Sequence, residues 1–158
     1  MSQSTDKQQT IRLGLMGYGY WGPNLLRNFA GSPGAMPVML ADPQPARLAK
    51  AKAMYPALET VTDADLLLGN ESIDAVVIAT PVSTHFALAK RALECGKHVL
   101  LEKPMTATVA EAEELVRLAA KRDLRLMVDH TFLYNPAIRT IRELIGSARI
   151  SVDAINSM

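Results

Sequence analysis

The stretch that decides the fold is LGLMGYGYWGPNLL, residues Leu13–Leu26. An apolar segment ends at Met16, glycines follow at positions 17, 19 and 22, and a helical pattern begins at Pro23. Proline is well tolerated in the first turn of a helix, where its missing N–H would have no partner. The spacing G-x-G-x-x-G between a strand and a helix predicts a turn that cradles a pyrophosphate with its backbone.

Short apolar runs alternate with helical patterns along the rest of the chain. The runs are almost continuously hydrophobic, as in strands covered on both faces, and they are Ile11–Met16, Val38–Ala41, Ala75–Ala79, His98–Leu101 and Arg125–Val128. The expected helices are Pro23–Ala30, Gln44–Tyr55, Ser83–Cys95, Thr108–Arg122 and Pro136–Ile145. This alternation predicts an α/β fold with a doubly wound parallel sheet.

We expect three parts in the chain. Residues 1–10 are polar and contain no apolar core segment, which is typical of a flexible leader and not of a signal peptide. Residues 11–131 are expected to form a dinucleotide-binding domain. Residues 132–158 are expected to form a crossover helix and the first strand of a truncated second domain.

Composition limits the possible functions. The 158 residues carry a net charge of +1, with 49% hydrophobic and 5% aromatic residues, so neither a nucleic acid nor a membrane surface is an expected partner. No apolar run approaches the roughly 20 residues of a membrane span. The single cysteine, Cys95, excludes an internal disulfide and fits the reducing cytoplasm, where we expect the protein to be located.

An acidic residue follows the second apolar run. Asp42 lies twenty residues after Gly22, where a carboxylate can accept both ribose hydroxyls of an adenosine and repel a 2′-phosphate. Residues 43–45 supply no cation to hold such a phosphate. The sequence therefore predicts NAD as the cofactor, with NADP disfavoured, although Asp42 could also serve as a helix cap.

Two further motifs lie at the ends of later apolar runs, where open α/β sheets bind their ligands. They are ATPVSTH at Ala79–His85 and LLEKPMT at Leu101–Thr106. Lys103, fixed beside Pro104, can stabilise a developing alkoxide while a hydride leaves, and Glu102 can orient it. His98 is expected to be structural, whereas His130 could face a nicotinamide or be a satisfied polar residue. No histidine pair has ligand spacing, so no metal site is expected.

The motifs together resemble the N-terminal half of the Gfo/Idh/MocA oxidoreductases, NAD(P)-dependent sugar and inositol dehydrogenases. GYGYWGPNLLRNF, ADP, the segment from ATPVSTH to EKPMT, and HTFLYNPAIRTIRELI carry the resemblance over residues 11–146. Within the family, GYGYWGPN and DHTFLYNPAIR are most similar to dehydrogenases that oxidise a nucleotide-sugar 3-hydroxyl. One departure is Val82, where the family commonly has asparagine.

The resemblance implies a Rossmann fold and a role for each matching position. The lysine at the nicotinamide, which is the expected catalytic residue, would be Lys103. The cofactor-binding residues would be Gly17, Tyr18, Gly19, Tyr20, Trp21, Gly22, Asp42, Thr80, Pro81, His85, Glu102, Lys103 and Pro104. The substrate would be a sugar, nucleotide sugar or cyclitol, and the full-length form a homo-oligomer.

Members of the family also carry a second α/β domain that supplies the substrate pocket and an aspartate/histidine pair. The chain ends at Met158, about where the first strand of that domain would begin. We therefore expect the nucleotide-binding half of an NAD-dependent oxidoreductase, catalytically incomplete by itself. The alternatives are a separate NAD-binding module and an interaction protein that keeps the scaffold without turnover.

Overall fold

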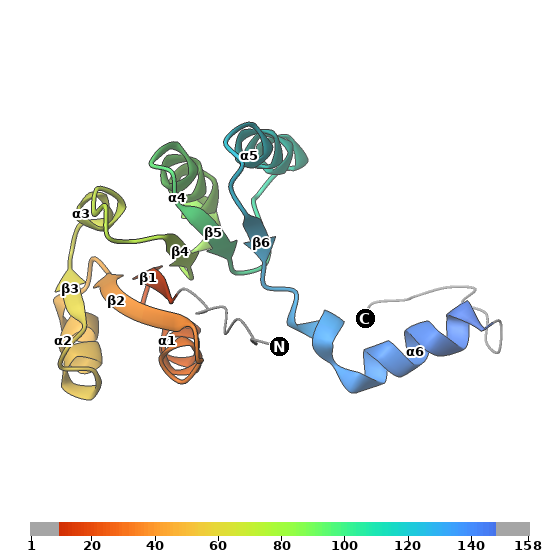
Figure 1. The fold of residues 1–158 in the computed structure, drawn as a ribbon, viewed down its shortest axis with the longest axis horizontal. Helices are drawn as coiled ribbons and strands as arrows, with labels where there is room; N and C mark the ends of the chain where they lie inside the picture. The colour runs from red at the N-terminus through yellow and green to blue at the C-terminus, as the bar shows by residue number, and fades with distance from the viewer. Residues whose placement is uncertain (1–9, 148–158) are drawn as a thin grey trace, which may run out of the picture. The chain divides into compact units, whose positions relative to one another are not determined.

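A computed structural model describes residues 10–147 (Figure 1). The chain divides into two compact units, one ending at Val128 and the other beginning at Asp129. The first unit contains the strands and most of the helices, so the expected functional residues up to Pro104 all belong to it.

The first unit is built on a six-stranded parallel sheet with the order β3-β2-β1-β4-β5-β6. The strands are β1 (Ile11–Met16), β2 (Ala35–Ala41), β3 (Glu59–Val61), β4 (Ala75–Ile78), β5 (His98–Leu101) and β6 (Leu126–Val128). The chain winds from β1 toward β3 and then returns to add β4 on the other side of β1. This arrangement confirms the predicted doubly wound sheet, and it puts the change of direction between β1 and β4.

Helices cover both faces of the sheet, as Figure 1 shows. One face carries α1 (Gly22–Ala30) and α2 (Pro45–Met54), and the other carries α3 (Ala64–Leu68), α4 (Val82–Glu94) and α5 (Val109–Lys121). Thr108 and Glu111 form a reciprocal capping box at the start of α5, as their spacing predicts. The structure adds β3 and α3, which the apolar pattern did not predict.

Each central strand contributes to two hydrophobic cores because its side chains alternate between faces. In β4, Val76 and Ile78 belong to the core under α3, α4 and α5, whereas Val77 belongs to the core under α1 and α2. Met16 and Leu15 divide in the same way in β1. Burial on both faces explains why these strands are almost continuously hydrophobic.

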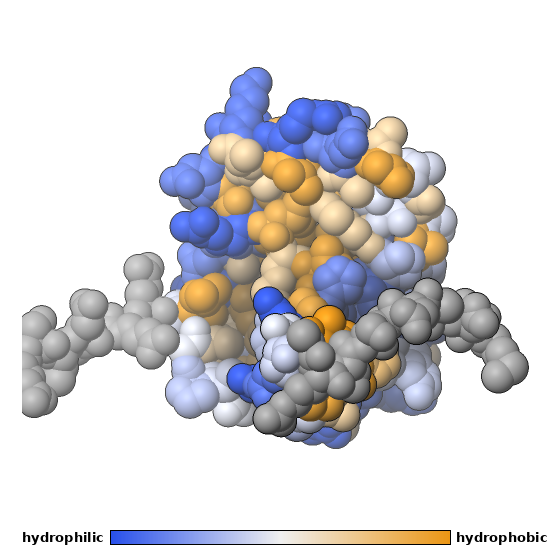
Figure 2. All heavy atoms as spheres, turned by 90° about the vertical axis from the view of Figure 1, so that its right-hand side faces the viewer, coloured by the Kyte–Doolittle hydropathy of each residue, from blue (hydrophilic) through white to orange (hydrophobic). Residues whose placement is uncertain are grey.

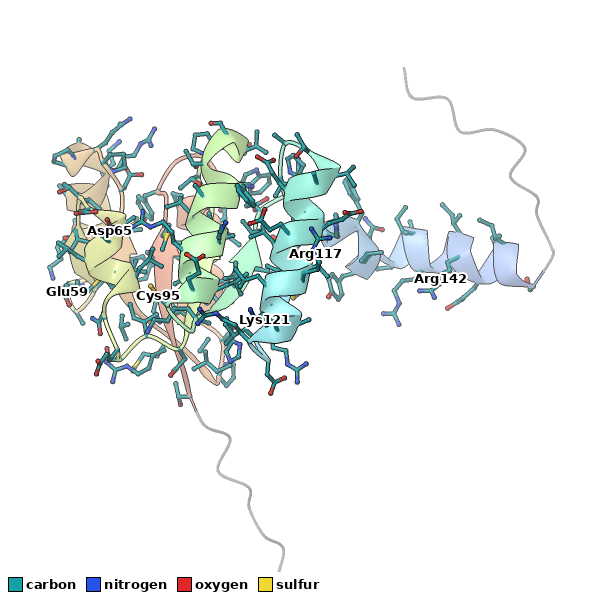
Figure 3. The ribbon with its side chains drawn as sticks, turned by 90° about the horizontal axis from the view of Figure 1, so that it is seen from above. Glu59, Asp65, Cys95, Arg117, Lys121 and Arg142 are labelled. Atoms are coloured by element: carbon teal, nitrogen blue, oxygen red, sulfur yellow. The ribbon has the colours of Figure 1, made fainter. Side chains whose placement is uncertain are left out.

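Polar contacts hold the helical layer and the loop that precedes β4. Asp65 on α3 lies beside α4 (Figure 3) and forms an ion pair with Arg91. The buried ammonium of Lys97 donates hydrogen bonds to the carbonyls of Asn70 and Ile73, at 2.8 and 2.7 Å. These contacts fix the loop before β4, and therefore the start of the strand that ends at the cleft described below.

The second unit contains a 3-10 helix, η1 (Thr131–Tyr134), and α6 (Pro136–Gly146). The side chain of Asn135 caps α6 by accepting a hydrogen bond from the backbone N–H of Ala137. The predicted helix at Pro136–Ile145 is confirmed. The strand that the sequence predicts after it lies outside the described residues.

Apolar side chains are also found on the surface. Figure 2 shows a band of them on the side of the molecule where the chain leaves β6. Met127 on β6 is 48% exposed, and Ile138, Ile141 and Ile145 are exposed on α6. None of the helices within residues 10–147 combines the length and the apolar character needed to cross a membrane.

Candidate cofactor-binding site

The first glycine of the turn allows the backbone to pass close to a neighbouring strand. Gly17 has φ +93, a conformation that is readily available only to glycine. Its N–H donates to the carbonyl of Ala41 at 2.8 Å, at the end of β2. A Cβ at this position would be 2.7 Å from the carbonyl oxygen of Ala79, just after β4. Gly17 therefore joins the ends of three neighbouring strands.

The other two glycines have different surroundings. A Cβ on Gly22 would be only 2.3 Å from the carbonyl oxygen of Gly17, so the start of α1 is packed directly on the turn. A Cβ on Gly19 would meet nothing closer than the Arg47 Nη1, 3.9 Å away. Two glycines are thus required by the fold of the turn, whereas Gly19 leaves open space beside the backbone.

The N-terminus of α1 lies beside this space and is uncapped. Within residues 10–147 no side chain caps this end, and the first turn contains no acidic residue. The unpaired N–H groups and the macrodipole of a helix N-terminus favour an anion. Tyr20 and Trp21 precede the helix with exposed rings in an edge-to-face contact, 5.1 Å between centroids.

The turn opens onto a cleft of about 740 Å³. Residues at or after the ends of β1, β2, β3 and β4 form its walls, at the carboxyl edge of the sheet and at its topological switch point. The lining residues are Met16, Gly17, Gly19, Tyr20, Trp21, Ala41, Asp42, Pro43, Gln44, Arg47, Thr62, Ala64, Ala79, Thr80, Pro81, Thr84 and Leu88.

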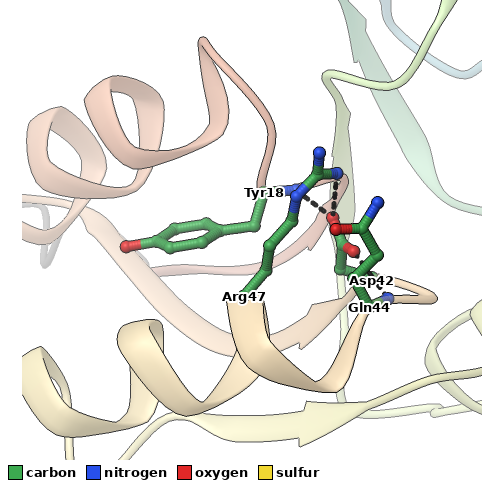
Figure 4. A network of polar contacts seen from close by, with 4 residues as sticks. All are labelled: Tyr18, Asp42, Gln44 and Arg47. Atoms are coloured by element: carbon green, nitrogen blue, oxygen red, sulfur yellow. Dashed lines mark hydrogen bonds and ion pairs between the residues drawn. The ribbon is translucent and has the colours of Figure 1, made fainter.

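Asp42 connects the glycine turn to the start of α2 (Figure 4). One carboxylate oxygen accepts the backbone N–H of Tyr18 at 2.7 Å, and the other accepts that of Gln44 at 2.9 Å. The residue is 2% exposed. Asp42 therefore positions the turn and the start of α2, in addition to lining the cleft.

Arg47, in the first turn of α2, was missed by the sequence argument, which considered only residues 43–45. Its Nη1 lies 3.4 Å from the Asp42 carboxylate (Figure 4), and its side chain is 40% exposed and lines the cleft. A cation is therefore present beside the expected ribose position. The signal was available in the sequence, because a residue in the first turn of the helix that follows Asp42 can reach back toward it.

Tyr18 has an unusual environment. It is 5% exposed, packs between α1 and α2, and its hydroxyl has no hydrogen-bond partner among the described residues. Burial raises the pKa of the phenol above its ordinary value of 10.0, and the charge of neighbouring Tyr55 raises it further. The backbone N–H of Tyr18, and not its ring, is the group that contacts Asp42.

We expect Tyr18→Phe to retain stability at neutral pH, because the substitution removes a buried hydroxyl that has no partner. The raised pKa means that the folded state resists ionisation of Tyr18. The wild type should therefore lose stability as the pH rises above 10 toward the folded-state pKa, and Tyr18→Phe should lose less. Urea unfolding at pH 8 and pH 10.5 measures the difference. The control is Tyr20→Phe, at an exposed position, and equal alkaline losses in the wild type and both variants would contradict the prediction.

Thr80 and Pro81 line the cleft after β4. The hydroxyl of Thr84, on α4, lies 2.8 Å from the Thr80 hydroxyl and 2.7 Å from the Pro81 carbonyl. These short contacts fix the part of the cleft wall that follows β4. Val82 begins α4 directly after this wall.

Glu102, Lys103 and Pro104 follow β5, the strand next to β4. The backbone N–H of Glu102 donates to Ile78 at 2.9 Å, and the Glu102 carboxylate accepts the backbone N–H of Lys103 at 3.2 Å. The Lys103–Pro104 peptide bond is cis, and Lys103 is exposed. The structure thus holds Lys103 at the carboxyl edge of the sheet, one strand beyond the lining residues.

The three histidines differ in their surroundings. His85, on α4, is 1% exposed and contacts the carbonyls of Thr80 and Pro104 through its two ring nitrogens. His98 accepts the backbone N–H of Arg125 on its Nδ1 at 3.0 Å, and His130 is exposed. Nowhere between residues 10 and 147 do three or more metal-binding side chains gather. Cys95 is exposed directly after α4 (Figure 3).

Comparisons with known proteins agree with this geometry. The chain is 34% identical over 147 residues to dTDP-3,4-didehydro-2,6-dideoxy-alpha-D-glucose 3-reductase of Streptomyces violaceoruber, covering 92% of this chain and 43% of that protein. Scyllo-inositol dehydrogenase of Lactobacillus casei has a similar structure, with a TM-score of 0.83 and 27% identity over 91% of this chain and 43% of that one.

A second similar structure contains a bound cofactor. KijD10, a 3-ketoreductase from Actinomadura kijaniata, was solved with NADP and TDP-benzene; the TM-score is 0.82 and the identity 29%, over 88% of this chain and 43% of that one. The chain spans about two fifths of the length of the relatives that it matches.

The family model described as "Oxidoreductase family, NAD-binding Rossmann fold" matches residues 11–130. The glycine turn of this chain, its cleft at the switch point and its similarity to known proteins agree with this match. The chain belongs to the Gfo/Idh/MocA oxidoreductase family.

Proposed function

We propose that this chain binds NAD or NADP in the cleft and forms the dinucleotide-binding part of a dehydrogenase or reductase. The substrate class is a secondary hydroxyl, or the corresponding ketone, of a sugar, nucleotide sugar or cyclitol. The names of the similar proteins, a deoxysugar 3-reductase, a 3-ketoreductase and an inositol dehydrogenase, support this class.

The observation that carries the proposal is the open space at Gly19, beside the bare N-terminus of α1. A Cβ on Gly19 would lie 3.9 Å from its nearest neighbour, the Arg47 Nη1, whereas Gly17 and Gly22 are tightly packed. A pyrophosphate needs such space next to backbone N–H groups. Gly17, Gly19 and Gly22 would form the cradle, with the backbone N–H groups of Tyr20 and Trp21 beside it.

The adenosine ribose would lie near Asp42 and Arg47, and Thr80 and Pro81 would line the path toward the nicotinamide. When bound, NAD(P) supplies the nicotinamide that accepts or gives a hydride. The ammonium of Lys103 would then donate a hydrogen bond to the substrate oxygen and stabilise negative charge on it. Glu102 and Pro104 would hold Lys103 in place.

Fluorescence titration of NADH with the purified chain tests the proposal directly. Saturable binding that ADP-ribose competes away is expected, because ADP-ribose retains the adenosine and the pyrophosphate. Absence of binding at millimolar NADH would overturn the proposal.

The proposed preference is for NAD, with NADP accepted through Arg47. A carboxylate at position 42 repels a 2′-phosphate, but the guanidinium 3.4 Å from it can hold one. We expect Arg47→Ala to weaken NADPH binding by about 10- to 100-fold, since hydrogen bonds to charged groups contribute about 1.5–3 kcal/mol. NADH affinity should change much less.

Titration of NADH and NADPH against the same variant measures this change in discrimination. The matched control is Lys50→Ala, which removes the same charge from an exposed position on α2 that does not line the cleft. Equal losses for both nucleotides in Arg47→Ala, or an equal effect of Lys50→Ala, would contradict the assignment.

We further infer that these 158 residues bind the cofactor without turnover of substrate. The lining residues of the cleft all lie between Met16 and Leu88, and the similar proteins are more than twice as long. Substrate-binding groups would then come from sequence that the match does not include. Oxidation of any sugar or cyclitol by the purified chain would overturn this inference.

A further inference from the structure

We propose that His85 is a positioning residue that ties together the two loops on the nicotinamide side of the site. This inference rests on the proposed function, because it assigns to His85 the task of holding the loop that carries Lys103. His85 itself is 1% exposed and does not line the cleft, so it acts through the groups that it holds.

The contacts of the His85 ring come from two different loops. Its Nε2 lies 2.9 Å from the carbonyl oxygen of Thr80, in the loop after β4. Its Nδ1 lies 2.9 Å from the carbonyl oxygen of Pro104, in the loop after β5. One ring, on the first turns of α4, therefore bridges the cleft wall and the residue that follows Lys103.

The number of N–H groups on the imidazole ring limits the hydrogen bonds that His85 can donate. A carbonyl oxygen only accepts hydrogen bonds, and a neutral imidazole has one N–H, so it can donate to only one of the two carbonyls. The second nitrogen would then face the other oxygen with a lone pair, and that contact would not be a hydrogen bond. Both contacts are hydrogen bonds only when both ring nitrogens carry protons.

Other features of the site support a positioning role. Thr80 is also held by the Thr84 hydroxyl, and Lys103 by the Glu102 carboxylate through its backbone N–H. Those contacts act within one loop or on neighbouring residues. His85, in contrast, connects the loop after β4 to the loop after β5.

Nuclear magnetic resonance of the wild-type chain with 15N-labelled histidine gives the first test, at pH 6. We expect His85 to show a slowly exchanging ring proton, because both ring nitrogens lie against carbonyl oxygens and the side chain is 1% exposed. The other two histidines are internal controls: the Nδ1 of His98 accepts a hydrogen bond and should carry no proton, whereas the exposed ring protons of His130 should exchange rapidly. Ring protons of His85 that exchange as rapidly as those of His130 would overturn the proposal without any variant having to fold.

Two substitutions then separate the two contacts. Glutamine places its amide near the position of Nε2 and can keep the bond to Thr80, whereas asparagine places its amide near Nδ1 and can keep the bond to Pro104. We expect His85→Gln to weaken NADH binding about tenfold, the effect of one lost hydrogen bond, and His85→Asn, which keeps the contact to the loop that carries Lys103, to weaken it less. ADP-ribose affinity should be unchanged in both, because that ligand lacks the nicotinamide.

The outcomes distinguish this proposal from the proposed function. If the wild type binds neither NADH nor ADP-ribose, the proposed function fails. If the wild type binds both ligands and His85→Gln matches it for NADH, only the role of His85 fails. Equal losses of NADH and ADP-ribose in the two variants would indicate a general packing role and would also overturn the positioning role.

Discussion

Gly19→Ala is expected to weaken NADH binding by about 10- to 100-fold while the chain remains as stable as the wild type. The added methyl group would occupy the space in which the pyrophosphate approaches the backbone, and overpacking of this kind costs about 1–3 kcal/mol. The fold has no such conflict, because the nearest atom to the new Cβ is 3.9 Å away at the end of a flexible arginine. Replacing a loop glycine without strain can even stabilise a protein by about 0.4–1 kcal/mol.

NADH titration and urea unfolding of the same preparation measure the two parts of this expectation. Gly31→Ala is the matched control, because its Cβ would make only an ordinary contact, 3.5 Å from the Arg27 carbonyl, and Gly31 does not line the cleft. NADH affinity in Gly19→Ala equal to that of the control would contradict the assignment of Gly19 to the pyrophosphate.

Gly22→Ala is expected to destabilise the fold itself. Its Cβ would be 2.3 Å from the Gly17 carbonyl oxygen, and this neighbour is backbone that the ends of three strands hold in place. Either α1 moves away from the turn or the turn opens, and each movement disturbs the core under α1. We expect a loss of about 3 kcal/mol, near the upper end for overpacking.

Thermal unfolding should show this loss as a decrease in Tm of roughly 6–12 °C for a domain of this size. NADH binding should also weaken, but in parallel with the loss of stability, whereas in Gly19→Ala the two effects separate. A Gly22→Ala variant with wild-type Tm would show that the turn relaxes easily, and it would remove the packing explanation for the third glycine.

Much of the fold could be predicted from the sequence because the central strands are buried on both faces. The ends of β1 and β5 were predicted to the residue from the extent of the two runs. The capping box at Thr108 and Glu111 similarly marked the start of α5. These are local signals, and each lies within one element.

The elements that were missed lack such signals. β3 has three residues, Glu59–Val61, at the edge of the sheet, and none of them is fully buried. α3 has five residues, and its clearest mark is the side chain of Asp63, which accepts the N–H of Asp65. Short edge elements are fixed by the neighbours they pack against, and those neighbours are not visible in a local pattern.

The residues of the site divide in the same way, into those that a local sequence motif reveals and those that only the folded chain brings together. The glycine spacing and Asp42 could be found from the sequence because the motif is local. The contact between Arg47 and Asp42 depends on the direction in which α2 leaves the sheet. The contacts of His85 join residues that are 5 and 19 positions away, and only the pairing of β4 with β5 brings these residues together.

The order of the strands along the chain has a consequence for synthesis. Within residues 10–147, the six strands of the sheet lie between Ile11 and Val128, and the cleft is lined by residues up to Leu88. Domains fold as units during translation, N-terminal first, so this cleft can be completed while later residues are still inside the ribosome. A dinucleotide that binds the nascent domain as proposed would stabilise it by mass action, and the cofactor would then act as a folding ligand before any substrate is met.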